Sequence, residues 1–167
     1  MPKFAYKWTP AGIWQRVHQM IRQPSDVILF WRLGYFIWSA PGRLNRSSLP
    51  TLLKNYRSSP RPKAIDPNAA IDRINRLSQP WLRRSFFRAR NTCYLRSLMM
   101  FRYLDPAGHD LRINFVVEPA INPGDRLKGH AWVTIDGAIL ESTAPDIIER
   151  TQQLYIYPPE VTSDAVD

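Results

Sequence analysis

The sequence predicts an α+β fold in which helices come first and an antiparallel sheet follows. Apolar residues recur at helical spacing through much of residues 13–102, and strict alternation begins at 111–117. Residues 130–142 are typical of a β-hairpin with an Asp-Gly turn. The chain has 167 residues, 44% of them apolar, which is enough to bury a core and excludes wholesale disorder.

Proline marks the helix starts in the first part of the chain. The Thr-Pro pair at 9–10 predicts a helix that ends at Pro24. Ser25 or Asp26 is expected to cap the next helix, which should reach about Trp38.

Two further helices are expected before the cysteine. A short helix with Tyr56 on its apolar face should follow Pro50, and Asp66 before Pro67 predicts the N-cap of another. The polar, proline-rich segment 58–64 between them is the best linker candidate.

The longest apolar stretch is VILFWRLGYFIW at 27–38, which contains Arg32. It is too short to span a bilayer, which takes about 20 residues. A buried helix is the favoured interpretation. A helix on a membrane surface, helped by the basic flank of Arg43 and Arg46, is the weaker one.

The single cysteine opens the last predicted helix. Thr92 is expected to be the N-cap, Cys93 should lie in the first turn, and the helix should end near 105–110. A cysteine placed there is either a small core residue or a nucleophile, because a helix N-terminus favours a thiolate. One cysteine cannot form an internal disulfide and no zinc-site spacing accompanies it, so we expect no metal, no cofactor and a reducing, cytoplasmic compartment.

Three regions are expected along the chain. Residues 1–64 form an N-terminal helical region suited to docking, residues 65–157 form the core, and residues 158–167 form a flexible acidic tail.

The net charge is +9, and arginines are densest just before the cysteine, at Arg83, Arg84, Arg88 and Arg90. Any one of these side chains belongs most simply to a solvated face. Together they favour an acidic protein or peptide partner, ahead of an anionic membrane. Nucleic acid ranks last because no nucleic-acid-binding motif accompanies the charge.

Cys93 and His130 can form a catalytic pair. A histidine on a strand beside the helix can take the thiol proton and return it to a leaving amine. The Cys93 backbone N–H can stabilise an oxyanion, and Asn91 is a guess for the second donor. By spacing alone the signal is weak, because a lone cysteine or histidine is more often structural.

A third group should orient the imidazole. With a two-residue turn at 136–137, Trp132 pairs with Glu141, which puts Glu141 on the His130 face and diagonally adjacent to it. Asp146, just past the strand, is the second choice, whereas Asp136 is expected to be only a turn former.

The motifs TCYLRSL at 92–98 and LKGHAWVTIDG at 127–137 resemble the transglutaminase-like cysteine peptidases of lasso peptide biosynthesis, often called B2 proteins. The match is good over roughly 81–141. It implies a papain-like core, with the Cys-bearing helix packed on an antiparallel sheet, Cys93 as nucleophile and His130 as general base. Tyr94 and Thr134 depart from the usual Leu and Glu of the family, and the acid of the family motif is met only by ESTAPD at 141–146.

The resemblance also implies partners. In that family the enzyme removes the leader from a ribosomally made precursor peptide, guided by a small leader-recognition B1 protein, before a separate macrolactam cyclase closes the ring. Docking of the partner and the leader would then fall to the basic, aromatic first half.

Three hypotheses remain open at this point. The chain is a cysteine peptidase, or a transglutaminase-like acyltransferase or amide ligase with the same triad, or a non-catalytic basic adaptor. The third predicts that alkylation of Cys93 leaves function intact, whereas the first two predict an unusually reactive thiol.

Overall fold

The computed structural model describes residues 20–60, 66–84, 87, 92–105, 108–119, 128–140, 148 and 150–159. These parts contain the helices α2 (Pro24–Arg46), α3 (Leu49–Ser58), α4 (Pro67–Leu82) and α6 (Cys93–Tyr103). The strands are β1 (Leu111–Glu118), β2 (Lys128–Ile135), β3 (Ala138–Ile139) and β4 (Gln152–Tyr157). The predicted α+β class, with a Cys-bearing helix packed on an antiparallel sheet, is confirmed.

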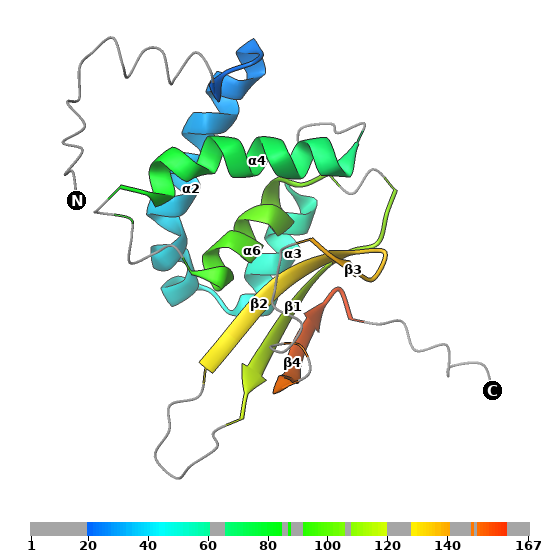
Figure 1. Ribbon diagram of the computed structural model, residues 1–167. Coiled ribbons are helices and arrows are strands. Elements are labelled where there is room, and N and C mark those ends of the chain that lie inside the picture. The colour runs from blue at the N-terminus through cyan, green and yellow to red at the C-terminus, as the bar shows by residue number, and fades with distance from the viewer. Residues whose placement is uncertain are drawn as a thin grey trace, which may run out of the picture.

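The strands form one antiparallel sheet in the order β3-β2-β1-β4 (Figure 1). The predicted hairpin is present, since Thr134 pairs with Ile139 across its turn. Asp136 and Gly137 form that turn with φ values of 50° and 80°, the left-handed conformation that a tight hairpin turn requires.

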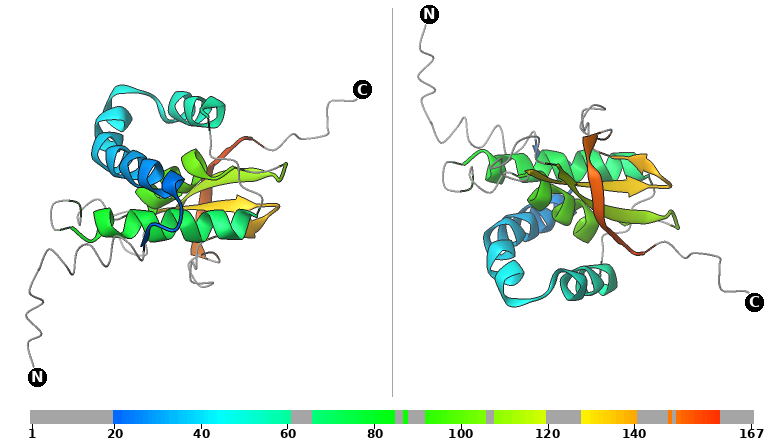
Figure 2. Two further views of the ribbon diagram at one scale, coloured as in Figure 1. Left: turned by 90° about the horizontal axis from the view of Figure 1, so that it is seen from above. Right: turned by 90° about the horizontal axis from the view of Figure 1, so that it is seen from below.

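Helix α6 lies at the centre of the fold (Figure 2). It contacts the other three described helices as well as β1 and β2. Its long apolar side chains are therefore buried almost completely: Leu95, Leu98, Met99, Met100 and Phe101. Burial of this many apolar groups is the main stabilising contribution to the fold, and it holds the start of α6 in place.

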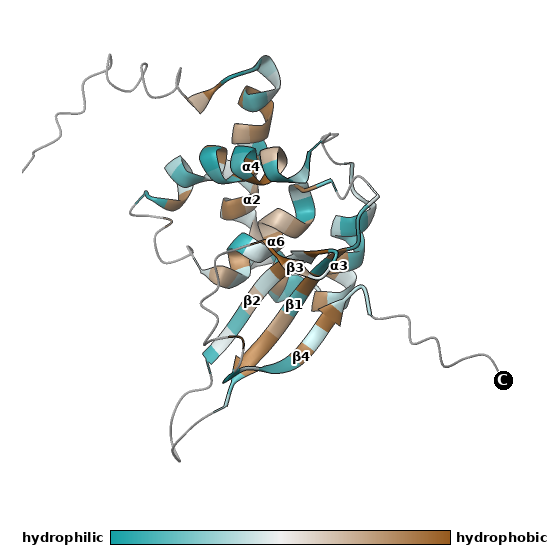
Figure 3. Cartoon of the chain, turned by 45° about the vertical axis from the view of Figure 1, so that its right-hand side comes forward, coloured by the Kyte–Doolittle hydropathy of each residue, from teal (hydrophilic) through white to brown (hydrophobic). Residues whose placement is uncertain are grey.

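The helices cover one face of the sheet. Ile113 and Phe115 of β1 join Ala131 and Val133 of β2 in the same buried cluster as the helices. Figure 3 shows the hydrophobic character of β1, which pairs with β2 on one side and with β4 on the other. Because side chains alternate along a strand, His130 and its even-numbered neighbours on β2 lie on the other face.

A buried ion-pair group joins α2 to α4. Asp26 is 0% exposed and accepts hydrogen bonds from Arg73 Nε at 2.6 Å, Arg76 at 3.4 Å and the Arg22 backbone N–H at 2.8 Å. Burial pushes the pKa of Asp26 upward, but these donors and the arginine charges outweigh it and hold the pKa below its usual range.

The same two helices also meet at an aromatic contact. The Trp81 indole N–H donates to Phe30 O at 3.0 Å, and its ring lies against Gly34. A Cβ added at Gly34 would come within 2.5 Å of the ring, so this position requires glycine for close approach.

Two expectations for α2 are wrong. Its N-cap is Gln23 rather than Ser25 or Asp26, because Asp26 is turned inward to the arginines. The helix also continues past Trp38 and through Pro41 to Arg46, and the turn before the proline is packed in the core, where Ile37 and Ala40 are fully buried.

The apolar stretch 27–38 is only half buried. Leu29, Leu33, Phe36 and Ile37 face the core, as the interpretation of a buried helix requires. The opposite face is exposed, with Ile28, Trp31, Tyr35 and Trp38 each between 57% and 62% accessible. Across the residues that the structure describes, none of the helices has the length and hydrophobicity to cross a membrane.

Other expectations are confirmed or untested. The short helix α3 buries Tyr56, and Asp66 caps α4 by accepting from the N–H groups of Asn68 and Ala69. Strand β4 was not predicted. The expected helix at 10–21, most of the linker and residues 160–167 of the tail lie largely or wholly outside the described chain.

Candidate active site

The first turn of α6 matches the sequence prediction. Thr92 is the N-cap, and its hydroxyl oxygen accepts from Leu95 N–H at 3.2 Å. Cys93 is therefore the first residue of the helix, where backbone N–H groups have no partner within the helix. The helix dipole favours negative charge at this end, whether a thiolate or an oxyanion.

The Cys93 thiol is partly exposed and lies 3.9 Å from the carbonyl oxygen of Gly129. Gly129 is bonded to His130, so the sulfur lies beside the backbone of the residue expected to act as base. The structure thus places the Cys93 thiol beside the backbone of β2 next to His130, although the rest of α6 and strand β1 separate the two residues in the sequence.

A second contact fixes this position from one turn further along α6. The hydroxyl of Ser97, fully buried, donates to Ala131 O at 2.8 Å. Gly129 and Ala131 flank His130, so α6 is attached to β2 on both sides of the histidine. Ser97 was not predicted, although its place one helical turn after Cys93 is a signal that could have found it.

These contacts are made at an edge of the sheet. Val133 O bonds to Leu140 N–H of the hairpin at 3.0 Å, so it points away from β1. Carbonyls of alternate residues point to the same side of a strand, and those of Gly129 and Ala131 therefore point the same way. Strand β3 is too short to reach them, and α6 lies beside β2 there instead (Figure 1).

His130 lies opposite Val116 of β1 and is half-buried. Trp132 and Thr134 share its face, where Asn114 Nδ2 donates to Thr134 Oγ1 at 3.3 Å. Thr134, which departs from the Glu of the resembling family, is thus buried and hydrogen-bonded.

Both candidates for the orienting acid fall outside the described residues. Glu141, Asp146 and the oxyanion candidate Asn91 are not among the described residues. The hairpin register used to place Glu141 is confirmed as far as it can be followed, by the pairs Thr134–Ile139 and Ile135–Ala138.

Asp136, the other acid of the hairpin, has a structural role at the far end of β2. It accepts from Asp110 N–H at 2.8 Å and contacts His109 Nδ1 at 2.6 Å. The Asp110 N–H and then His109 hold the pKa of Asp136 below its usual range. Both carboxylate oxygens of Asp136 thus bind groups at the turn, as expected for a residue that forms the turn.

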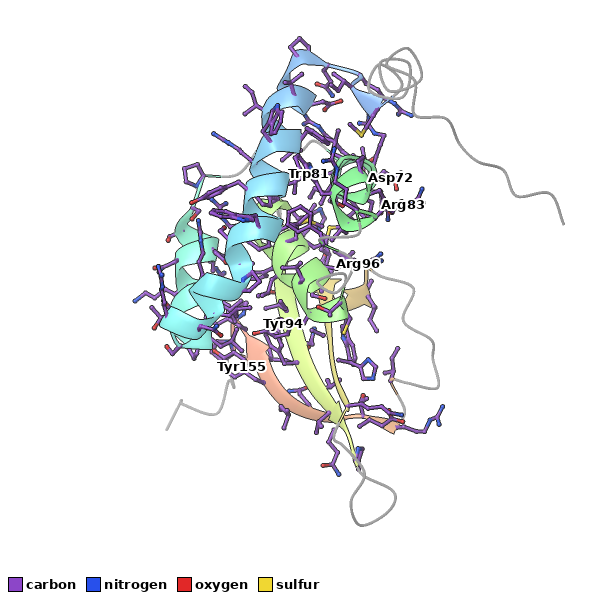
Figure 4. The ribbon with its side chains drawn as sticks, turned by 90° about the vertical axis from the view of Figure 1, so that its left-hand side faces the viewer. Asp72, Trp81, Arg83, Tyr94, Arg96 and Tyr155 are labelled. Carbon is purple, nitrogen blue, oxygen red and sulfur yellow. The ribbon has the colours of Figure 1, made fainter. Side chains whose placement is uncertain are left out.

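An aromatic row lies next to the cysteine on the helical face of the sheet. The Tyr94 ring centroid is 5.3 Å from that of Phe115, which is 6.2 Å from that of Tyr155 (Figure 4). Burial raises the pKa of both tyrosines, so both are protonated at neutral pH and neither is a general base. Tyr94, the second departure from the family motif, is thus a packing residue.

Arg83 and Arg84 lie exposed at the end of α4. Arg83 Nε donates to Gln79 at 3.2 Å, and the Arg84 guanidinium lies 5.4 Å from the Trp81 ring centroid. In Figure 4, Arg83 and Arg96 lie on the same side of the molecule. Arg96 follows Cys93 by three residues and was not predicted, while Arg88 and Arg90 lie outside the described residues.

Within the described parts of the chain, no three His, Cys, Asp or Glu side chains come together as a metal site would need.

A family model described as the transglutaminase-like superfamily matches residues 33–154, well over half of the chain. The chain belongs to the transglutaminase-like superfamily. Members of this superfamily are generally cysteine-dependent enzymes, and the domain is compatible with a cysteine peptidase or an acyltransferase. Searches of curated proteins and of solved structures find no match.

Proposed function

We propose that this transglutaminase-like protein is a cysteine peptidase that removes the leader from a ribosomally made precursor during lasso peptide maturation. One observation carries the proposal. The chain's only cysteine is the first residue of a helix, partly exposed, with its thiol 3.9 Å from the carbonyl oxygen that precedes His130. A purely structural cysteine would be expected to be buried.

The proposed chemistry uses Cys93 and His130 as a pair. His130 takes the thiol proton, the resulting thiolate attacks the scissile carbonyl carbon, and the oxyanion formed is stabilised by N–H groups at the start of α6. The C–N bond breaks as His130 gives its proton to the leaving amine. Water then hydrolyses the thioester, which releases the carboxylic acid and restores the thiol.

The lasso assignment depends on the motif resemblance described above and on a basic surface suited to an acidic partner. We propose Glu141 as the residue that orients His130, with Asp146 as the alternative. Arg83 and Arg84, with Arg88 and Arg90, are proposed to help recruit the leader or its recognition protein. Exposed charges act mainly on association, so raising salt should slow cleavage when the partner is present.

The experiment incubates the chain with the precursor peptide and the leader-recognition protein encoded beside it, and follows products by mass spectrometry. We expect one cut between leader and core, abolished equally by Cys93→Ala, by His130→Ala and by both together, since members of a catalytic unit are non-additive. Substantial turnover by Cys93→Ala would refute the mechanism.

A second measurement separates hydrolysis from acyl transfer. The same reaction is run with an excess of a simple amine such as glycine methyl ester. A peptidase gives mainly the free acid, whereas mainly amide product would favour the acyltransferase. The adaptor hypothesis gains support only if alkylation of Cys93 with iodoacetamide leaves function unchanged.

A further inference from the structure

A cavity of about 270 Å³ lies between α2 and the end of α6, at the opposite end of α6 from Cys93. Three of its lining residues are arginines: Arg32 and Arg43 from α2, and Arg102 from α6. The described residues that line it include no Asp or Glu. Three cations converging without a lining acid repel one another, and an anion between them would relieve that repulsion.

Two of the three arginines are held by neighbouring groups. Arg102 donates to Pro60 O at 3.3 Å and lies 5.2 Å from the Tyr103 ring centroid. The Arg43 guanidinium lies 5.6 Å from the Tyr35 ring centroid. Guanidinium groups held in this way lose less conformational freedom on binding, and they match a carboxylate with paired hydrogen bonds.

The remaining walls are aromatic. Tyr35, Phe36 and Tyr103 line the cavity, and the Tyr103 hydroxyl is fixed by donating to Arg32 O at 3.0 Å. Phe36 and Tyr103 meet edge to face with centroids 5.7 Å apart. A cavity with three cations and three aromatic rings suits an acidic group carried on an apolar stem.

The surroundings of the cavity favour a peptide over a small acid. Its volume of about 270 Å³ lies at the lower limit of the roughly 300–1,000 Å³ of small-molecule sites, so the volume alone admits either ligand. Tyr35, which lines it, also belongs to the exposed apolar stripe of α2, with Trp31 62% and Trp38 58% accessible. Such a stripe is long enough to receive further side chains of the same ligand.

We propose that this cavity binds an acidic side chain of a peptide partner, whose neighbouring apolar residues cover Trp31, Tyr35 and Trp38. Burial lowers the pKa of Arg102; Tyr103 and Tyr56 act in the opposite direction, and the charges of Arg32 and Arg43 lower it further. The site is separate from Cys93, and its occupation does not depend on thiol chemistry.

The test measures binding by fluorescence anisotropy to the full chain carrying Cys93→Ala, so that cleavage does not interfere. The probe is a short fluorescein-labelled peptide in which Glu alternates with Leu and Phe. Two matched peptides replace Glu by Gln, or Leu and Phe by Ala. We expect both replacements to weaken binding, the first by about tenfold or more because charge-assisted hydrogen bonds are lost.

Variants of the chain locate the site. Arg32→Gln and Arg43→Gln should each weaken binding by about tenfold, while Arg46→Gln, on the same helix but not lining the cavity, should leave it nearly unchanged. Arg32 and Arg43 are exposed, so their replacement is not expected to unfold the chain.

Three outcomes would overturn the proposal. Equal binding of the Glu and Gln peptides would show that the cavity does not recognise a carboxylate. Equal losses of affinity in Arg43→Gln and Arg46→Gln would show that the peptide is bound by the general positive charge of α2 and not by the cavity. The third outcome is displacement of the probe by phenylacetate or phenyl phosphate at lower concentrations than the unlabelled peptide needs. That result would identify a small anion as the ligand.

Discussion

Replacing Ser97 by alanine tests the attachment of α6 to β2 without touching the thiol. The Ser97 hydroxyl donates to Ala131 O at 2.8 Å, and these two residues are 0% and 2% exposed. The substitution removes the hydroxyl that donates to the Ala131 carbonyl, and water has little access to replace it because both residues are buried. A buried polar group left unpaired costs about 1–3 kcal/mol of the free energy of unfolding.

The effect on catalysis should exceed the effect on binding. Ser97 acts through the position of α6 relative to His130, and a displacement of about 1 Å can cost up to about 100-fold in rate. We expect kcat for precursor cleavage to fall by about 10- to 100-fold while KM changes little. Urea unfolding and steady-state kinetics on the same preparations measure the two effects.

Ser78→Ala is the matched control. Ser78 is 1% exposed and lies on α4, where its hydroxyl donates to Asn75 O of the same helix at 3.2 Å. Because that bond lies within a single helix, we expect Ser78→Ala to lower the free energy of unfolding by less than about 1 kcal/mol and to leave kcat unchanged. If Ser97→Ala and Ser78→Ala behave alike in both assays, the contact with Ala131 does not position the thiol.

Three other predictions concern the fold and the acid. Gly34→Ala should destabilise the fold by about 1–3 kcal/mol because the added methyl group meets the indole ring of Trp81. Gly42→Ala, with no atom within 4 Å of its added Cβ, should stabilise the fold by up to about 1 kcal/mol. Urea unfolding that finds Gly34→Ala the more stable variant would contradict this packing. The pKa of Asp26 is lower in the folded than in the unfolded chain, so its contribution to the free energy of unfolding is present above pH 3.8 and is lost as pH falls further. Asp26→Asn should cost about 1–3 kcal/mol at pH 7 and should reduce the loss of stability in acid. Parallel curves of stability against pH for the wild type and the variant would contradict this prediction. Glu141→Gln should lower kcat with residual activity left, and impairment by Asp146→Asn alone would move the orienting acid beyond the hairpin.

The local features of the site could be predicted because they depend on neighbouring residues. The Thr92 cap, the first-turn position of Cys93 and the Asp-Gly turn each follow from short-range hydrogen bonding and backbone preference. The contact of Ser97 with Ala131 could not be predicted in this way, since it depends on how α6 meets the edge of β2.

Long-range packing also explains the errors in α2 and β4. Asp26 is suited by type to an N-cap, but partners on α4, distant in sequence, turn it inward. Pro41 would end an isolated helix, yet α2 continues through it, after a turn in which Ile37 and Ala40 are fully buried in the core. Strand β4 is six residues long and depends on pairing with β1, which the sequence pattern does not reveal.

The shortness of β3 links hairpin length to the reactive centre. Its two residues leave the outward carbonyls of Gly129 and Ala131 available, and α6 takes the place that a longer strand would occupy. An exposed strand edge is also where chains pair and aggregate, so the same helix shields β2 from other molecules. An insertion that lengthened the β3 pairing would displace the thiol and its shield together, so indels in this hairpin should be tolerated less well than those in an ordinary surface turn.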